Sequence, residues 1–133
     1  MKQLICAVAL VMGLSFAASA QNAQPKVIAL LTKASWCHVC QENSPRFMKD
    51  VMPMVMKNKE VKMVMNDVSN DKTKATSKPM LEKEGIYEFA EKNPGTGMLY
   101  FLNGKTKELI SKISLAQSNE EIKKAYMEAL SKG

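Results

Sequence analysis

The chain has 133 residues, a formal net charge of +6 at pH 7 and only 6% aromatic residues. Its length is sufficient for one domain with one hydrophobic core, and no linker, low-complexity tract or internal repeat divides it. The positive charge comes almost entirely from Lys, because Arg46 is the single Arg. This composition argues against a nucleic-acid surface, which favours Arg and stacking rings. A basic patch for an acidic partner stays open.

The first 20 residues predict a secretory signal peptide. Lys2 is followed by an apolar run from Leu4 to Ala18 and then by Ala18-Ser19-Ala20, a pattern that predicts cleavage after Ala20. The alternative is an uncleaved membrane anchor, but the run is short for a span of about 20 residues. Cys6 lies at the start of the run, which argues against a lipidated Cys at its end.

Cleavage divides the chain into a signal peptide, residues 1–20, and one domain, residues 21–133. The domain is expected to be secreted, without stable insertion in a membrane, and to act as a monomer. It retains two Cys, Cys37 and Cys40, in a compartment where disulfides persist.

The first half of the domain predicts strand, helix and strand. Val27–Leu31 is a continuous apolar run, typical of a buried strand. Apolar residues at spacings of three and four predict a helix from His38 to about Asn58, and Pro45 and Pro53 predict a kink or a break in it. Val61–Val68 alternates and predicts a second strand.

The second half begins with a polar, Lys-rich segment, Ser69–Ser77, which we expect to be a loop. Lys78–Lys92 is expected to be helical, with Pro79 in its first turn. Met98–Leu102 predicts a third strand, and Asn103-Gly104 is a strong signal for a tight hairpin turn.

The fourth strand is expected at Leu109–Leu115, with its odd-numbered residues on one face. Ser118 and Glu121 have the spacing of a capping box. They are expected to open a final amphipathic helix, whose apolar stripe consists of Ile122, Ala125, Tyr126, Ala129 and Leu130.

The predicted order of elements is β-α-β-α-β-β-α. The first two strands must be parallel because a helix crosses between them, and the hairpin makes the last two antiparallel. The sequence therefore predicts an α/β fold, a four-stranded mixed sheet with helices on both faces.

The motif Cys37-His38-Val39-Cys40 lies where the first strand ends and a helix begins. A helix N-terminus carries unpaired N–H groups and a partial positive charge. A thiolate there is stabilised, and its pKa falls from about 8.5 toward about 3.5–7.5. We expect Cys37 to be exposed and to attack disulfides, and Cys40, one turn further on, to be shielded and to resolve the mixed disulfide.

These residues resemble the thioredoxin superfamily, whose signature is a Trp-Cys-x-x-Cys motif after an apolar strand, here Trp36 to Cys40. Pro45 matches the family's proline in the active-site helix, and the C-terminal strands and helix match in order. The family's extra N-terminal strand and helix are expected to be absent or reduced. The resemblance implies a thioredoxin-like fold, a redox-active Cys37–Cys40 disulfide and thiol–disulfide oxidoreductase activity without a cofactor.

The partners that the resemblance implies are protein thiols and disulfides, together with a membrane electron donor or acceptor. The compartment it implies is the bacterial periplasm. The direction of electron flow stays open between oxidation, reduction and isomerisation.

The sequence departs from the family at three positions. Thr96 stands where the family has a cis-proline facing the dithiol, so substrate docking along Gly95-Thr96 is expected to be altered, or the Thr96 hydroxyl to contact Cys37. Leu31 stands where thioredoxin has a buried Asp. Proton transfer would then use water, Lys33, Glu42 or His38. The third departure is His-Val between the cysteines, in place of Gly-Pro.

Several residues near the motif have two interpretations each. His38 either stabilises the Cys37 thiolate and makes the disulfide more oxidising, or faces solvent with little effect. Trp36 either shields the dithiol and contacts substrates, or caps the core. Val39 is placed with them as a tuning position between the cysteines.

Two other functional classes compete with an enzyme. Cys37, His38 and Cys40 offer metal ligands, but a closed zinc site usually has four, so we expect no metal. Haem attachment needs His after the second Cys, where Gln41 stands. The remaining alternative is a non-catalytic binding or chaperone-like domain on a thioredoxin-like scaffold.

Overall fold

The computed structural model describes residues 24–133, so the predicted signal peptide lies outside the described residues. Within these residues, four strands and five helices follow one another in the predicted order, except that the first two predicted helical stretches are each divided into two helices. They are β1 (Val27–Lys33), α1 (His38–Asp50), α2 (Met52–Lys57), β2 (Val61–Asp67), α3 (Asp71–Lys83), α4 (Tyr87–Lys92), β3 (Met98–Asn103), β4 (Leu109–Ser114) and α5 (Asn119–Lys132).

The four strands form one mixed sheet in the order β2-β1-β3-β4. β1 and β2 are parallel, and β3 is antiparallel to both β1 and β4, which confirms the predicted α/β fold. β1 is hydrogen-bonded on both edges and covered on both faces, which explains its continuous apolar sequence. Its carboxyl end delivers the chain to the Trp-Cys motif.

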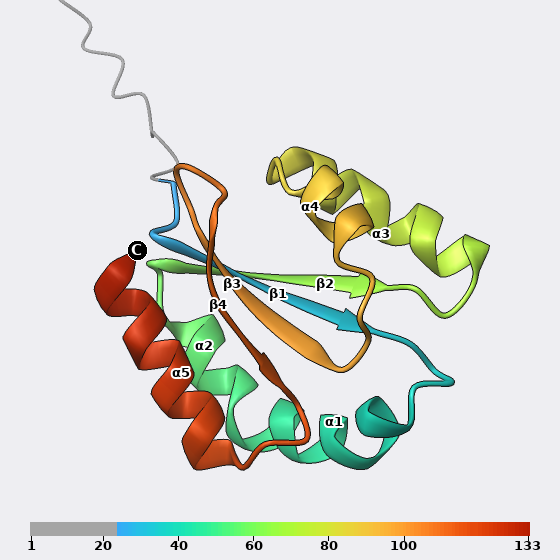
Figure 1. The fold of residues 1–133 in the computed structure, drawn as a ribbon, viewed down its shortest axis with the longest axis horizontal. Coiled ribbons are helices and arrows are strands. Elements are labelled where there is room, and N and C mark those ends of the chain that lie inside the picture. Colours follow the sequence, from blue (N-terminus) through green and yellow to red (C-terminus); the bar gives the residue numbers. More distant parts are fainter. Residues whose placement is uncertain (1–23) are drawn as a thin grey trace, which may run out of the picture.

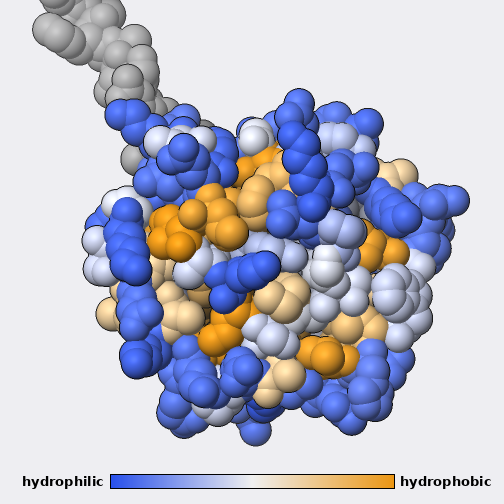
Figure 2. Space-filling model, in the orientation of Figure 1, coloured by the Kyte–Doolittle hydropathy of each residue, from blue (hydrophilic) through white to orange (hydrophobic). Residues whose placement is uncertain are grey.

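Helices cover both faces of the sheet (Figure 1). α1, α2 and α5 lie on one face, where Val27, Ala29 and Leu31 of β1 belong to the larger core. α3 and α4 lie on the other, where Ile28 and Leu30 belong to a smaller core. The alternation of side chains along a strand produces this division. Figure 2 shows the same side of the molecule, mostly polar at its rim, with apolar side chains visible in its central part.

The predicted helix from His38 to Asn58 is broken, as expected, and the break falls at Val51. Pro45 lies inside α1 without ending it. Pro53 lies in the first turn of α2, where a residue without an N–H donor is tolerated. The final helix is also confirmed, because Ser118 and Glu121 form the capping box of α5.

The predicted loop at Ser69–Ser77 is wrong, because α3 begins at Asp71 and runs to Lys83. Asn70 and Thr73 cap its first turn reciprocally, and Pro79 lies inside the helix rather than in its first turn. A helix with so few buried residues has little apolar periodicity in its sequence. The predicted helix at Lys78–Lys92 is divided at Gly85, whose φ of 71° ends α3.

The hairpin after β3 is present, but its turn is longer than Asn103-Gly104. The Asn103 and Lys107 N–H groups donate to the carbonyls of Glu108 and Asn103, both at 2.8 Å. Gly104 is required by close approach, because a Cβ there would lie 1.7 Å from the Pro25 carbonyl oxygen. The prediction that the odd-numbered residues of β4 share one face is wrong at the start of the strand, because a bulge opposite Phe101 and Leu102 shifts the alternation of side chains. Leu109 is therefore 43% exposed, and Ile110 packs against the larger core instead.

Candidate active site

Cys37 is the N-cap residue of α1. Its extended backbone lets Sγ accept a hydrogen bond from the Cys40 N–H at 3.2 Å, as a Ser or Asp oxygen does at other helix starts. The Cys37 N–H donates to the Ala34 carbonyl at 3.2 Å, which fixes the turn after β1. The motif therefore lies at a strand end and a helix start, where the sequence places it. Both cysteines are in the thiol form.

The segment before β3 forms the opposite wall of the site. Gly97 has a φ of 71°, and a Cβ there would lie 2.8 Å from Val39 Cγ1 and 3.5 Å from Cys37 Sγ. The Gly97 N–H donates to the Thr32 carbonyl at 2.8 Å, which anchors the segment to β1. A side chain at Gly97 would push the segment off the dithiol. Gly97 was not predicted as a site residue, and its only sequence signal is the run Pro94-Gly95-Thr96-Gly97.

The pKa of the Cys37 thiol is lowered. Burial acts to raise it, but hydrogen bonds from the Cys40 and Thr96 side chains and from backbone N–H groups outweigh burial. Thr96 is thus one of the groups that lower the pKa of Cys37. The pKa of Cys40 is raised, first by burial and then by its hydrogen bond to Cys37. Cys37 is therefore the sulfur that ionises first.

The expectation that Cys37 is exposed is wrong, whereas Cys40 is shielded as expected, because each residue is 5% exposed. Val39 and Val68 pack against the small cluster that both cysteines form with Ala34. The close approach of Gly97 contributes to the cover. Any molecule that reacts with Cys37 Sγ therefore has to displace part of this cover.

A polar network holds the Trp36 loop against the end of β2. Asp67 accepts a hydrogen bond from the Lys33 ammonium at 2.8 Å and from the Ser69 N–H at 3.0 Å. Ser69 in turn accepts from the Ser35 N–H at 2.7 Å, and its carbonyl accepts from Trp36 Nε1 at 3.1 Å. Burial acts to raise the pKa of Asp67, but Lys33 and Ser69 hold it well below the usual carboxyl range.

Asp67 and Ser69 were not predicted as site residues. Their only signal is their polarity directly at the end of a strand. The ring of Trp36 is 62% exposed, so it does not cap the core.

The other predicted site residues lie around this centre. The His38 ring lies 3.0 Å from the Glu42 carboxylate, and both side chains are exposed. Gly95 is exposed and lies beside the Tyr100 hydroxyl. Pro45 lies further along α1, past the dithiol. Leu31 is 1% exposed and belongs to the larger core, as its place in the buried strand predicts.

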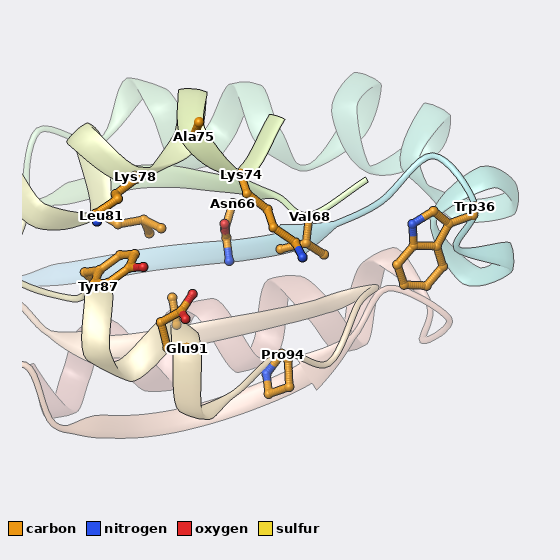
Figure 3. Close-up of a pocket in the computed structure, with 11 residues that line it drawn as sticks. Trp36, Asn66, Val68, Lys74, Ala75, Lys78, Leu81, Tyr87, Glu91 and Pro94 are labelled. Atoms are coloured by element: carbon orange, nitrogen blue, oxygen red, sulfur yellow. The ribbon is translucent and has the colours of Figure 1, made fainter. Parts of the chain in front are cut away.

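Two grooves flank the dithiol on opposite faces of the sheet. The Cys40 groove, about 350 Å³, is lined by Leu31, Lys33, Ala34, Ser35, Cys40, Gln41, Ser44, Met48, Met65, Asp67 and Ser69. The α3–α4 groove, about 470 Å³, is lined by Trp36, Asn66, Val68, Lys74, Ala75, Lys78, Leu81, Tyr87, Ala90, Glu91 and Pro94 (Figure 3). Only the first groove contains a cysteine.

Within residues 24–133, no cluster of three or more His, Cys, Asp or Glu side chains could hold a metal ion. Across the same residues, every helix is too short or too polar to cross a membrane.

Comparison with known proteins identifies the fold. Searches with the sequence found no matching family model and no curated relative. A "putative protein disulfide isomerase" from Bacteroides thetaiotaomicron matches in structure at 18% identity, over 80% of this chain and 74% of that one, with a TM-score of 0.53. The C-terminal domain of a "putative thiol-disulfide oxidoreductase" from the same organism matches at 17% identity, over 86% and 84%, with a TM-score of 0.54. A thioredoxin from Wuchereria bancrofti aligns at 19% identity, over 80% and 83%, with a TM-score of 0.49.

The chain has the thioredoxin-like fold. Its Cys37–Cys40 pair has the spacing of a CxxC motif, at the strand-to-helix junction of that fold. The described part of this thioredoxin-like chain contains no cis peptide bond, so Thr96 follows a trans peptide.

Proposed function

We propose that the chain is a thiol–disulfide oxidoreductase that exchanges electrons with protein dithiols and disulfides through Cys37 and Cys40. The observation that carries the proposal is the place of Cys37 at the N-cap of α1, where its Sγ accepts the Cys40 N–H at 3.2 Å, and the pKa directions, lowered for Cys37 and raised for Cys40, agree with it. Only a thiolate attacks a disulfide. Cys37 therefore ionises at a lower pH than Cys40, and Cys40 keeps its proton until the mixed disulfide is resolved.

In the reducing direction, the Cys37 thiolate attacks one sulfur of a substrate disulfide. A Cys37–substrate disulfide forms, and the other substrate sulfur leaves as a thiolate that takes up a proton. Cys40 then loses its proton and attacks Cys37 Sγ, which closes the Cys37–Cys40 disulfide and releases the second substrate thiol. Two electrons and two protons pass to the substrate, and oxidation of a substrate dithiol is the reverse.

The proton of Cys40 leaves through the Cys40 groove in this proposal. Cys40, Lys33 and Asp67 line that groove together. The groove gives water access to the resolving thiol at a place where Leu31 offers no acceptor. Trp36, Gly95 and Thr96 contact the substrate, Val39 and His38 adjust the motif from its outer side, and Pro45 shapes α1. No cofactor or metal takes part.

We also propose that residues 1–20 export the chain and that residues 21–133 act as a monomer in the bacterial periplasm. A membrane protein of the dithiol–disulfide class would exchange electrons with Cys37 and Cys40 there. The apolar run Leu4–Ala18 and the Ala18-Ser19-Ala20 sequence support export. Mass measurement of the chain recovered from the envelope of an expressing cell tests it, since cleavage after Ala20 leaves Gln21 as the first residue.

The low exposure of Cys37 favours a second candidate, a non-catalytic binding domain on the same scaffold. One experiment separates the two. The purified chain should reduce a protein disulfide in the presence of a small dithiol, Cys37→Ser should abolish turnover, and Cys40→Ser should accumulate the mixed disulfide. Equal turnover by wild type and Cys37→Ser overturns the enzyme proposal. If wild type shows no turnover while a folded chain captures a polypeptide, the second candidate takes its place.

A further inference from the structure

Lysines from four separate parts of the chain lie at the end of the sheet opposite the dithiol. Figure 1 shows the start of β1, the β3–β4 hairpin and the C-terminus at this end, and the turn from β1 to α1 at the other. We call this end the basic pole. Its lysines are Lys26 before β1, Lys57 and Lys59 where α2 ends and β2 begins, Lys105 and Lys107 in the hairpin, and Lys132 at the end of α5.

Backbone contacts around Lys26 hold these parts of the chain together. Its N–H donates to the Glu60 carbonyl at 2.7 Å, and its own carbonyl accepts from the Gly104 N–H at 2.8 Å. A Cβ on Gly133 would lie 2.9 Å from the same carbonyl, which places the end of α5 beside them. The Lys107 ammonium donates to the Gly104 carbonyl. The fold therefore gathers at one end lysines that are far apart in the sequence.

The charge of these lysines is not neutralised within the chain. None of them has an ion pair with another of residues 24–133, and residues 1–23 contain no Asp or Glu. The acidic groups at this end are Glu60, Glu108 and the carboxylate of Gly133, so the lysines are twice as many. Lys62 and Glu84, which lie 3.9 Å apart, neutralise each other. A net positive charge is therefore left at the basic pole.

The end of the molecule that contains the dithiol has a different distribution of charge. Lys33 is paired with Asp67 there, and the His38 ring lies beside the Glu42 carboxylate. β1, seven residues long, connects the two ends, so they are on the order of 20 Å apart. This separation is about two Debye lengths at about 0.1 M salt. A negative surface bound at the basic pole therefore leaves the electrostatics of the dithiol nearly unchanged.

Two exposed apolar side chains flank the lysines. Met56 directly precedes Lys57 and is 63% exposed, and Leu109, at the start of β4, is 43% exposed. Basic and apolar side chains that are exposed together are typical of surfaces that bind to anionic bilayers. Lys is a flexible point charge without the planar fork with which Arg recognises a single phosphate or carboxylate. The basic pole therefore fits an extended negative surface better than one specific acidic site.

We propose that the basic pole binds peripherally to the headgroups of an anionic phospholipid membrane, with Met56 and Leu109 entering the headgroup layer. The dithiol then faces away from the bilayer, where a protein in solution can reach it. The proposal adds a binding surface to the domain and does not depend on the proposed oxidoreductase function. A test by membrane binding therefore succeeds or fails separately from any test of turnover.

The test compares two double substitutions that remove the same charge from opposite ends of the molecule. Lys57→Gln with Lys105→Gln changes the basic pole. Lys72→Gln with Lys74→Gln is the matched control, because both residues are exposed and lie at the start of α3, near the dithiol. All chains are recovered from the cell with the same N-terminus, checked by mass, so that any contribution of residues 1–23 is common to them. Sedimentation measures their partition onto vesicles of phosphatidylcholine with about 30% phosphatidylglycerol, at about 0.1 M salt.

The basic-pole variant should partition about 25-fold more weakly than wild type, since each lysine near an anionic surface contributes a factor of about five. The control variant should stay within about threefold of wild type, because its charges are screened at that distance. Met56→Gln should weaken binding to these vesicles about threefold and leave binding to soluble polyglutamate unchanged. Vesicles of phosphatidylcholine alone should bind none of the chains.

Trp36 reports the orientation of the bound chain, because it is the single Trp of the sequence, is 62% exposed and lies at the dithiol end. Its emission should not shift on binding, and brominated lipids in the vesicles should not quench it. Quenching by these lipids would show that the dithiol end meets the bilayer and would overturn the proposal. Equal partition of the two double variants would overturn it too. Binding of wild type to polyglutamate but not to the anionic vesicles would replace the membrane with an acidic polypeptide as the partner.

Discussion

The surroundings of Cys37 and Cys40 differ although the two residues are three positions apart and equally buried. Cys37 caps α1, so its Sγ accepts a hydrogen bond from the Cys40 N–H. The Thr96 side chain also lowers the pKa of Cys37. Cys40 lies one turn inside the helix, where burial dominates and its bond to Cys37 raises its pKa further. In the proposed reaction, hydrogen-bond donors, rather than exposure, therefore divide the roles of attacking and resolving sulfur.

The two surroundings also belong to different layers of the fold. The Gly97 backbone acts on Cys40 as well, but the Thr96 side chain acts on Cys37, while Cys40 lines the groove that contains the Lys33–Asp67 ion pair. A substitution of a side chain beside one sulfur should therefore affect that sulfur and leave the other unchanged. The following substitutions test that separation.

The largest effect is expected for Asp67→Asn on the Cys40 side. It removes the Lys33 ion pair and weakens the Ser69 contacts that hold the Trp36 loop. The pair is intermediate between exposed pairs, about 0–1 kcal/mol, and buried ones, about 3–5 kcal/mol. We expect a loss of about 2 kcal/mol in the free energy of unfolding at pH 7, measured by urea denaturation.

This stability should depend on pH with a defined sign. The pKa of Asp67 is lower in the folded chain than in the unfolded chain, so its contribution is complete above about pH 4 and is lost as the pH falls toward the lowered value. The difference between wild type and Asp67→Asn should shrink on acidification. Asp71→Asn, an exposed carboxyl in the first turn of α3, is the control. An equal loss in both variants, or a shift in the pKa of Cys37 in Asp67→Asn, contradicts the separation.

Thr96→Val should affect the Cys37 side. It removes a hydrogen bond to the thiolate, which is worth about 1.5–3 kcal/mol for a charged acceptor, and the pKa of Cys37 should rise by about one unit or more. The thiolate fraction at pH 7 then falls about tenfold per unit, but the more basic thiolate is a better nucleophile, so turnover should fall about threefold. Thiolate absorbance against pH measures the shift.

Thr96→Ser keeps the hydroxyl and should restore both the pKa and the turnover. The Cys40 titration should keep its raised value in both variants. If the Cys37 titration is the same in Thr96→Val as in wild type, Thr96 is a packing residue and the hydrogen-bond explanation for Cys37 is wrong.

The elements that the sequence predicted well are those whose local signals agree with their burial. β1 is apolar throughout because both its faces are covered, and α5 has a capping box and a full apolar stripe. α3 was missed because it packs on the sheet through few residues, Ser77 and Leu81 being its buried ones. The bulge in β4 has no local signal, because it depends on how β4 pairs with Phe101 and Leu102.

The candidate site was predictable where the chemistry is contiguous in the chain. Cys37 and Cys40 could be placed at a helix start from the Val27–Leu31 strand and the spacing of the motif. The cover over Cys37 could not be predicted, because it arises from the approach of Gly97, 60 positions away in the chain.

The smallest effect is expected for His38→Ala. The sequence left two interpretations open, stabilisation of the Cys37 thiolate or a solvent-facing side chain. The ring is 80% exposed and lies 3.0 Å from Glu42, and the groups that lower the pKa of Cys37 are hydrogen bonds that do not include it. An exposed charge contributes about 0–1 kcal/mol. Since about 1.4 kcal/mol corresponds to about 30 mV for a two-electron couple, removal of the imidazole should change the reduction potential of the Cys37–Cys40 pair, measured against glutathione, by less than about 20 mV. Glu42→Ala should change this potential as little. A shift of about 30 mV or more in His38→Ala alone would show that the imidazole acts on the thiolate through solvent, and the division of roles by hydrogen bonds would then be incomplete.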